Sequence, residues 1–475
     1  MKDRVLGFLP LDNRPCTSRF PRRIAEMGGF SLDTPPFGML GGLTQPAAIE
    51  EISRWLEENA ADWQALVLSL DTLGFGGLIP SRQSNDPLST ILGRLEVLKK
   101  IKQRHPALEI YAFGVSTRLS RHAAPEEEKS YWPKQGENIS LFSFHLERFG
   151  RLRQNEDRIA FLEAKKRIPP EILQDYLRTR SRNFRVLVEM IRWAQQGLFR
   201  ALHLTQDDTE EFGINVAEKR RLAVLADGNP KVLVYPGADE VASTLLAKFF
   251  NREKSPSFFP IYSHPGGEKV RGIYEDCSIA ESVARHLKAS AALLATTEEE
   301  ADFLLFLNVP STNQGDLCLE ILDGADSPPR DLAPFLARLR KSEKPSLLVD
   351  VAYANGADPA LMRELCRADL ERLIAFSAWN TTGNSLGTAL AAASAGPGKK
   401  KKSFLWERVA EDYLYMTLLR PPLRRDGDLS PEKLENALNF LWSELFGKDD
   451  ELFTASYPWG RFFEADVALM NEKAE

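Results

Sequence analysis

Short hydrophobic runs recur along the chain, and most of them end in polar residues or glycine. They lie in the segments RVLGFLPLDNRP, ALVLSLDTLGFGG, EIYAFGVSTR, ALHLTQDD, KVLVYPGADE, SFFPIYSHPGG, DFLLFLNVPST, SLLVDVAYANGAD and RLIAFSAWNTTGN. Continuous apolar runs of about five to seven residues are typical of strands buried on both faces. Between most of them, segments such as AAIEEISRWLEENA and DEVASTLLAKFF carry apolar residues at helical spacing. Strands that alternate with helices predict a parallel sheet with right-handed crossovers.

The number of these runs favours a barrel. Strong strand candidates lie near residues 4, 65, 109, 201, 232, 302, 346 and 372, a further one lies near residue 257, and GFSLDTPP is a weaker candidate. The pattern predicts α/β architecture with a (β/α)8-type barrel, in which these strands share one sheet. Two lobes of doubly wound parallel sheet, divided near residue 252, would produce the same alternation and stay open as the alternative.

The helical segments outside this alternation suggest a domain organisation. We expect a barrel-like catalytic domain over residues 1–395, with a helical insertion at about residues 120–200. The insertion either builds one wall of a site or forms a plain helical hairpin. AGPGKKKKS, at residues 395–403, is expected to be a solvated loop because like charges repel one another. Residues 403–475 contain FLWERVAEDYLYMTLLR and PEKLENALNFLWSELFG, which predict a helical C-terminal appendage.

Composition narrows the class of protein. The 475 residues are 43% hydrophobic and carry a formal net charge of -6, so the chain can bury a large core but lacks the basic character of nucleic-acid-binding proteins. Neither a signal-peptide core nor an apolar run of about 18 residues appears, so we expect a cytoplasmic protein without a membrane span. The cysteines are too far apart for a C-x-x-C pair, which argues against a disulfide framework or structural zinc: Cys16, Cys277, Cys318 and Cys366.

Polar side chains collect where the predicted strands end. In parallel α/β folds, ligands bind at the carboxyl ends of the strands. We therefore predict that this rim binds a substrate through Asp12, Asn13, Arg14, Asp71, Arg118, Asp239, Glu240, His264, Asp350, Tyr353, Asn355, Trp379, Asn380 and Asn384. Asn308 and Asp358 follow strands in the same way.

The most reactive of these strand ends is ALHLTQDD, which closes on the adjacent carboxylates Asp207 and Asp208. Repulsion between neighbouring carboxylates separates their pKa values, so that one can hold a proton while the other stays ionised. This division of roles suits general acid/base catalysis at a glycosidic bond. The competing interpretation is structural: DDTEEFGINVAEKRR could start a helix capped by Asp208 or Thr209.

The pair is similar in position and residue type to the acidic pair of substrate-assisted retaining hexosaminidases. The resemblance implies that Asp207 orients the 2-acetamido group of the substrate, whose oxygen attacks the anomeric carbon. Asp208 would then protonate the leaving oxygen. Trp379, after the last predicted strand, would be the floor on which the sugar stacks.

LPLDNRPC is the most distinctive string of the chain. It resembles the opening signature, LPLD-x-RP, of an uncharacterised bacterial domain-of-unknown-function family of about this length. SLDTLGFGGLIPSR, TQDDTEEFG, PGADE, VAYANGAD and AWNTTGNSLGTALA fit the same family, so the resemblance covers most of the chain. It implies no established activity.

Other chemistries find less support. The glycines after Asp71 are not in the dinucleotide-binding register, and neither a P-loop nor G-x-S-x-G occurs. Metal-ligating residues never stand at short spacing, and His203 lies inside a predicted strand as a core histidine, so we expect neither metal nor cofactor. We predict a glycoside hydrolase with a small carbohydrate substrate and no nucleic-acid or membrane partner. A metal-dependent hydrolase or lyase and a non-catalytic sugar-binding regulatory protein are the alternatives.

Overall fold

The computed structural model describes residues 4–119, 125–322, 329–396, 401–447 and 451–470. The chain forms two compact units. Unit 1 consists of Met1–Asn13, Phe30–Leu245 and Tyr274–Asp276. Unit 2 consists of Arg14–Gly29, Leu246–Ile273 and Cys277–Glu475.

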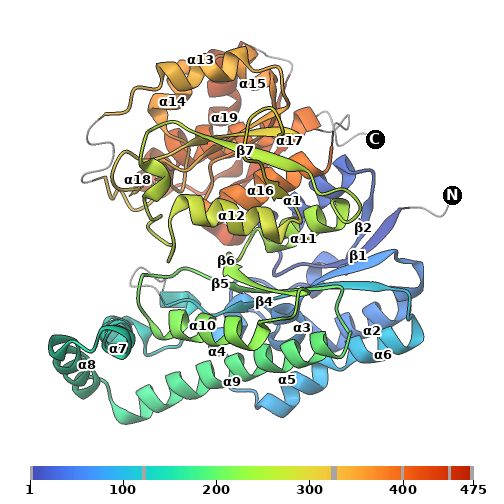
Figure 1. Cartoon of the computed structure of the whole chain (residues 1–475), viewed down its shortest axis with the longest axis vertical. Helices are drawn as coiled ribbons and strands as arrows, with labels where there is room; N and C mark the ends of the chain where they lie inside the picture. The colour runs from blue at the N-terminus through green and yellow to red at the C-terminus, as the bar shows by residue number, and fades with distance from the viewer. Residues whose placement is uncertain (1–3, 120–124, 323–328, 397–400, 448–450, 471–475) are drawn as a thin grey trace. The chain divides into compact units, whose positions relative to one another are not determined.

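Unit 1 is built on a six-stranded parallel sheet in the order β2-β1-β3-β4-β5-β6 (Figure 1). Its strands are β1 (Val5–Leu9), β2 (Ser31–Asp33), β3 (Ala65–Ser69), β4 (Glu109–Ser116), β5 (Ala201–Gln206) and β6 (Val232–Pro236). Every residue of β3 and β5 is buried, as expected for strands that are covered on both faces.

Helices complete unit 1: α2 (Ile49–Asn59), α3 (Leu70–Phe75), α4 (Leu78–Gln83), α5 (Leu88–Leu95), α6 (Val97–Arg104), α7 (Trp132–Leu152), α8 (Asn155–Arg167), α9 (Pro170–Gln195) and α10 (Ile214–Ala226). Alternate strand residues such as Leu66 and Leu202 join one core with Met190 of α9 and Leu56 of α2. The long helix α9 thereby anchors the insertion to the sheet.

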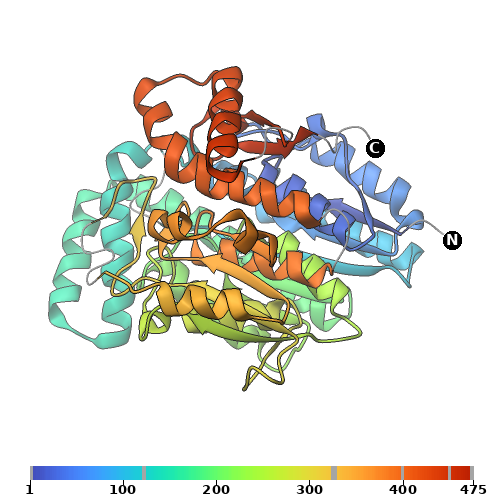
Figure 2. The same ribbon diagram turned by 90° about the horizontal axis from the view of Figure 1, so that it is seen from above.

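The insertion itself forms a small core of its own. Helices α7 and α8 lie side by side (Figures 1 and 2, teal). Ile139 and Phe142 of α7 pack with Ala164 of α8 and Tyr176 of α9. Because these apolar residues recur at helical spacing on each helix, the three helices bury a common face, and the insertion is a packed helical layer rather than a loop.

Unit 2 contains a five-stranded parallel sheet in the order β8-β7-β9-β11-β13. Its strands are β7 (Ser257–Tyr262), β8 (Leu293–Leu294), β9 (Phe303–Asn308), β11 (Ser346–Asp350) and β13 (Leu373–Ser377). Numbered along the chain within the unit, the order is 2-1-3-4-5, which is also the order of the first five strands of unit 1. Both sheets thus have the flavodoxin-like doubly wound order, whose ligands bind at the carboxyl ends of the strands.

The remaining elements of unit 2 cover its sheet and extend the chain beyond it. They are α1 (Pro15–Met27), α12 (Ile279–Ala289), α13 (Ala333–Lys341), α14 (Pro359–Glu364), α15 (Arg367–Glu371), α16 (Thr382–Ser394), α17 (Lys401–Val409), a π-helix η5 (Ala410–Leu419), α18 (Arg420–Asp426) and α19 (Pro431–Phe446). Helix α11 (Val241–Phe250) spans the boundary between the units. Two further strand pairs are β10 (Gly315–Asp316) with β12 (Tyr353–Ala354), and β14 (Phe453–Ser456) with β15 (Asp466–Leu469).

The α/β class with parallel sheets is as predicted, but the expectation of one closed barrel is not confirmed. The strands lie in two open sheets, so the prediction that those near residues 4, 65, 109, 201, 232, 346 and 372 share one sheet is wrong. Strand alternation is a local signal, whereas sheet closure depends on pairing between strands far apart in sequence. The predicted loop at residues 395–403 lies partly outside the described residues, and α17 begins at Lys401.

Candidate functional site

The acidic pair Asp207 and Asp208 lies at the carboxyl end of β5, in unit 1. The strand ends at Gln206, and α10 begins only at Ile214, with Gly213 as its N-cap and no capping side chain. The alternative prediction that Asp208 or Thr209 caps this helix is therefore wrong. The loop between the strand and the helix leaves both carboxyl groups available for other contacts.

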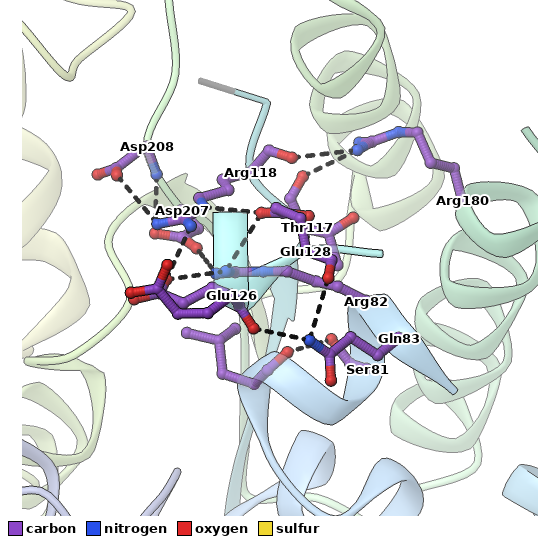
Figure 3. Close-up of polar contacts among 12 residues, drawn as sticks. Ser81, Arg82, Gln83, Thr117, Arg118, Glu126, Glu128, Arg180, Asp207 and Asp208 are labelled. Atoms are coloured by element: carbon purple, nitrogen blue, oxygen red, sulfur yellow. Dashed lines mark hydrogen bonds and ion pairs between the residues drawn. The ribbon is translucent and has the colours of Figure 1, made fainter. Parts of the chain in front are cut away.

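Asp207 is held by an ion pair with Arg82 of α4. Nη2 of Arg82 donates a hydrogen bond to Oδ2 of Asp207 over 2.5 Å, and the side chain of Arg82 is only 4% exposed (Figure 3). The other carboxylate oxygen, Oδ1, accepts the backbone N–H of Asp208 at 2.9 Å. Both carboxylate oxygens of Asp207 therefore have fixed hydrogen-bond donors, one of which is charged.

Arg118, which follows β4, binds two glutamates next to the acidic pair. It donates to Oε2 of Glu127 at 2.7 Å and to Oε1 of Glu128 at 3.1 Å, and its Nη1 lies 3.9 Å from Oδ2 of Asp208. Nη1 of Arg82 lies 3.4 Å from each glutamate. Burial alone would lower the pKa of Arg118, but the charges of the neighbouring carboxylates outweigh burial and raise it. These two arginines and four carboxyl groups form one network, which we call the arginine–carboxylate cluster.

Asp208 differs electrostatically from its neighbour. Burial first, and the charge of Asp207 second, raise the pKa of Asp208 to about 7, although Arg118 and Arg82 oppose the shift. Asp239, after β6, adds to the increase. The Asp208 side chain is still 26% exposed, so a ligand can reach it. Near neutral pH Asp208 can therefore release a proton, beside a neighbour whose carboxyl group is bound by Arg82.

A further carboxyl group, that of Asp71, lies just after β3, in the first turn of α3. Its side chain is buried and accepts the backbone N–H of Val115 at 2.8 Å. Burial raises the pKa of Asp71 to about 7, whereas the Val115 N–H and the charge of Arg82 lower it. The next residue, Thr72, donates its hydroxyl to the carbonyl oxygens of Pro10 and Leu11, which ties the end of β3 to the end of β1.

The helical insertion fixes the other side of the cluster. Arg180 of α9 donates to the carbonyl oxygen of Thr117 at 3.1 Å and to that of Arg118 at 3.4 Å, and it pairs with Glu218 at 2.5 Å (Figure 3 shows Arg180 beside Thr117 and Arg118). The Arg180 side chain thus fixes the backbone at Thr117 and Arg118, from which the Arg118 side chain extends into the cluster. The insertion therefore contributes a side chain that contacts the backbone next to the arginine–carboxylate cluster.

Two hollows adjoin the cluster. One is narrow, with room of about 20 Å³, and lies between Arg82, Arg118 and the aromatic rings of Trp132 and Tyr176. The other is an open groove of about 640 Å³, and the two share Glu128, Lys129 and Tyr131. The groove is also lined by Gln83, Asn85, Glu126, Ser130, Glu171, Ile172 and Asp175. Lys129 is paired with Asp175 at 2.7 Å, so carboxylates and neutral polar groups dominate this surface.

The other predicted residues of unit 1 lie at strand ends of the same sheet. Asp12 is buried, and Asn13 donates its amide to the carbonyl oxygen of Gly41. Glu240 is fully buried and accepts the backbone N–H of Ala238 at 3.0 Å, which indicates a structural role in the turn after β6. Asp239 is buried and acts on the cluster through its charge.

The remaining predicted binding residues belong to unit 2: Arg14, His264, Asp350, Tyr353, Asn355, Trp379, Asn380 and Asn384. The expectation that all the predicted residues lie at the rim of a single sheet is wrong, because the strands lie in two sheets. The proposed sugar floor is also wrong, because Trp379 is 1% exposed. Its ring packs edge-on against Phe20, and its Nε1 donates to Thr388.

Asp350 has a structural explanation within unit 2. It accepts the side-chain amide of Asn308 at 2.9 Å and the backbone N–H groups of Ala352 and Asp358. Asp358 is paired with Arg330 at 2.8 Å, with both side chains 1% exposed. Burial, followed by the charge of Asp358, raises the pKa of Asp350 to about 7. This closed network joins the ends of β9 and β11.

Sequence reasoning missed several members of the arginine–carboxylate cluster. Arg82 stands in the quoted segment SLDTLGFGGLIPSR, but it lies within helix α4 rather than at a strand end, and it was not among the predicted site residues. Glu127 and Glu128 belong to the run PEEE, which has the composition of a solvated surface. The signal that points to Arg82 is the need of a buried acidic pair for a positively charged partner.

Two properties of the described residues bear on other classes of site. Within those ranges, no three histidine, cysteine, aspartate or glutamate side chains are grouped as ligands for a metal ion. None of the helices described is both long and apolar enough to traverse a bilayer. His203, interpreted from the sequence as a core residue, is fully buried, and its Nδ1 lies 3.2 Å from the hydroxyl of Tyr235.

Comparison with known proteins identifies the family but no activity. The family model described as "Protein of unknown function (DUF4127)" matches residues 6–468, so the chain belongs to this family, as the LPLDNRP signature predicted. Neither a curated protein nor a solved structure matches the chain.

Proposed function

We propose that this member of a family of unknown function hydrolyses a glycosidic bond in a small carbohydrate, using the acidic pair of unit 1. Asp208 is the general acid, and Asp207 is the carboxylate that orients the substrate. The observation that carries the proposal is the division within the pair: Arg82 holds Asp207 over 2.5 Å, while the pKa of Asp208 is raised to about 7. Unequal environments of this kind separate acid and base roles.

The chemistry assigns one step to each carboxyl group. Asp208 gives its proton to the oxygen of the leaving group as the bond to the anomeric carbon breaks. The oxygen of the substrate's own 2-acetamido group forms the new bond to that carbon, and water later opens the cyclic intermediate with Asp208 acting as base. Asp207 accepts the acetamido N–H. Its oxygens already accept from Arg82 and from the backbone of Asp208, but each carboxylate oxygen can accept a second hydrogen bond.

The groove beside the cluster supports a carbohydrate as the substrate. Its volume of about 640 Å³ falls in the usual range for small-molecule sites. The side chains of Gln83, Asn85 and Ser130 can donate to and accept from sugar hydroxyls, and Tyr131 offers an aromatic face. The carboxylates of the lining favour neutral or amine-bearing sugars over acidic ones.

Rate measurements on Asp207→Asn and Asp208→Asn test the proposal. The substrates are a series of aryl and alkyl N-acetylhexosaminides whose leaving groups differ in acidity. Asp208→Asn should slow turnover by about 10²–10⁴-fold for poor leaving groups and much less for activated aryl ones, which need little protonation. Asp207→Asn should slow all of them, because the internal nucleophile is no longer oriented. Asp227→Asn, at an exposed position after α10, is the matched control and should leave turnover unchanged.

Three results would count against this assignment. Equal rates for wild type and both variants would remove the pair from catalysis. Loss of wild-type turnover in the presence of a chelator would point to the alternative, a metal-dependent hydrolase or lyase. Binding of N-acetylhexosamine without turnover would favour a sugar-binding protein instead.

A further inference from the structure

Unit 2 contains a second concave site, around helix α18. The hollow measures about 340 Å³ and lies between this helix and the segment at residues 317–320. It is lined by Leu317, Cys318, Leu319, Glu320, Arg420, Pro421, Arg424 and Arg425. Three of these side chains are guanidinium groups and only one is a carboxylate, so the lining carries a formal charge of about +2.

Arg420 is the most unusual member, because it is buried and has no carboxylate partner in the part of the chain that the structure describes. Its side chain belongs to a residue that is 2% exposed, and it donates to the carbonyl oxygens of Phe463 and Asn355. Among the described residues it makes no ion pair. Since moving a charge out of water is costly unless an opposite charge compensates, a buried guanidinium that contacts only carbonyl groups leaves charge available for a bound anion.

Arg424 and Arg425 add charge at the mouth of the hollow. Arg424 follows Arg420 by one helical turn, so both project from the same side of α18. Arg424 donates from Nη1 to the carbonyl oxygen of Cys318 at 2.9 Å, which positions it across the hollow. Both residues are exposed, and neither is ion-paired within the ranges that the structure describes.

We propose that this hollow binds a small molecule through a phosphate monoester group. The guanidinium fork matches the oxygens of phosphate and can bind two of them at once. A phosphate monoester carries a charge of about -1.5 to -2 near neutral pH, which balances the charge of the lining, whereas a single carboxylate would not. The site lies in unit 2 and does not depend on the glycosidase proposed for unit 1.

Calorimetry on the full chain tests the proposal, with glucose 6-phosphate as the probe and glucose and acetate as comparison ligands. Wild type should bind glucose 6-phosphate and bind the other two far more weakly. Arg424→Gln combined with Arg425→Gln should weaken binding by about tenfold or more, because the variant loses two charged groups that can donate to the phosphate oxygens. Arg363→Gln combined with Arg372→Gln removes the same charge from exposed positions of unit 2 outside the hollow, and should bind like wild type.

Arg420→Lys gives a second, independent variant. It keeps the buried charge but removes the planar fork, so it should weaken phosphate binding while its circular dichroism spectrum stays that of wild type. Three results would overturn the proposal: no binding of glucose 6-phosphate by wild type, equal weakening in the control pair, or acetate bound as tightly as the phosphate ester.

Discussion

Replacing Arg82 by glutamine tests whether the arginine–carboxylate cluster is a buried electrostatic unit. The substitution removes the ion pair with Asp207 at 2.5 Å and the weaker contacts with Glu127 and Glu128 at 3.4 Å. The side chains of Arg82 and Asp207 are 4% and 11% exposed, so water screens the pair poorly. Removing one partner of a buried ion pair typically costs about 3–5 kcal/mol, because the other charge stays buried without compensation.

The cost should depend on pH. At pH 7.5 the variant leaves Asp207 buried next to Asp208 without its ion pair to Arg82, and we expect the free energy of unfolding to fall by about 3–5 kcal/mol. At pH 5, below the pKa of about 7 of Asp208, that neighbour keeps its proton and repels Asp207 less, so the loss should be smaller. Urea unfolding followed by circular dichroism at both pH values measures the difference.

Two further variants make the result interpretable. Arg94→Gln removes an ion pair with Asp86 of similar length, 2.7 Å, but those side chains are 21% and 40% exposed, so we expect a cost of at most about 1 kcal/mol. Arg82→Gln combined with Asp207→Asn leaves no stranded charge and should lose less stability than the sum of the single variants. A cost for Arg82→Gln below about 1 kcal/mol, or one that is the same at pH 5 and 7.5, would refute the reasoning.

Three other predictions follow from the structure. If Asp208 is the general acid, kcat/KM for poor leaving groups should fall about tenfold per pH unit above about 7, where its pKa lies, and a flat profile would exclude that role. Burial raises the pKa of Asp412 from 3.8 to about 7, so between these pH values the folded state binds more protons than the unfolded state. The free energy of unfolding should therefore fall as pH rises through this window, by up to about 1.4 kcal/mol per pH unit. Asp412→Asn should flatten that slope in urea unfolding from pH 4.5 to 7.5, and an unchanged slope would contradict the assignment. Trp379→Ala should lower the free energy of unfolding by about 3–5 kcal/mol, whereas Trp379→Phe should leave KM for any sugar unchanged because the ring is in the core.

The strands were predictable because their signal is local. The apolar runs around Leu66, Leu202 and Leu347 are buried strands in the structure, as the continuous hydrophobic pattern indicates. The pairing of strands was not predictable, because β6 and β7 follow one another in sequence but belong to separate sheets. A barrel and two open sheets need the same local pattern, and only long-range pairing separates them.

The candidate site was also predictable only in part. Asp71, Arg118 and Asp239 were placed near the acidic pair by the rule that ligands bind where parallel strands end, and all three act on the cluster in unit 1. The same rule failed for Trp379, since a residue at a strand end can turn into the core as easily as towards a ligand. Arg82 comes from a helix, and nothing in its local sequence marks it as the partner of Asp207.

The placement of α1 has a consequence for how the chain is synthesised. Residues 14–29 are made directly after the first strand of unit 1, yet they belong to unit 2. In that unit Phe20 packs against Trp379, and the guanidinium carbon of Arg408 lies 3.7 Å from the centre of the Phe20 ring. On the ribosome, α1 therefore emerges long before its partners and must wait for most of the polypeptide to follow. A gene fragment that begins at residue 246 would encode the whole sheet of unit 2 but omit this early helix, and its product would have to fold with an open core.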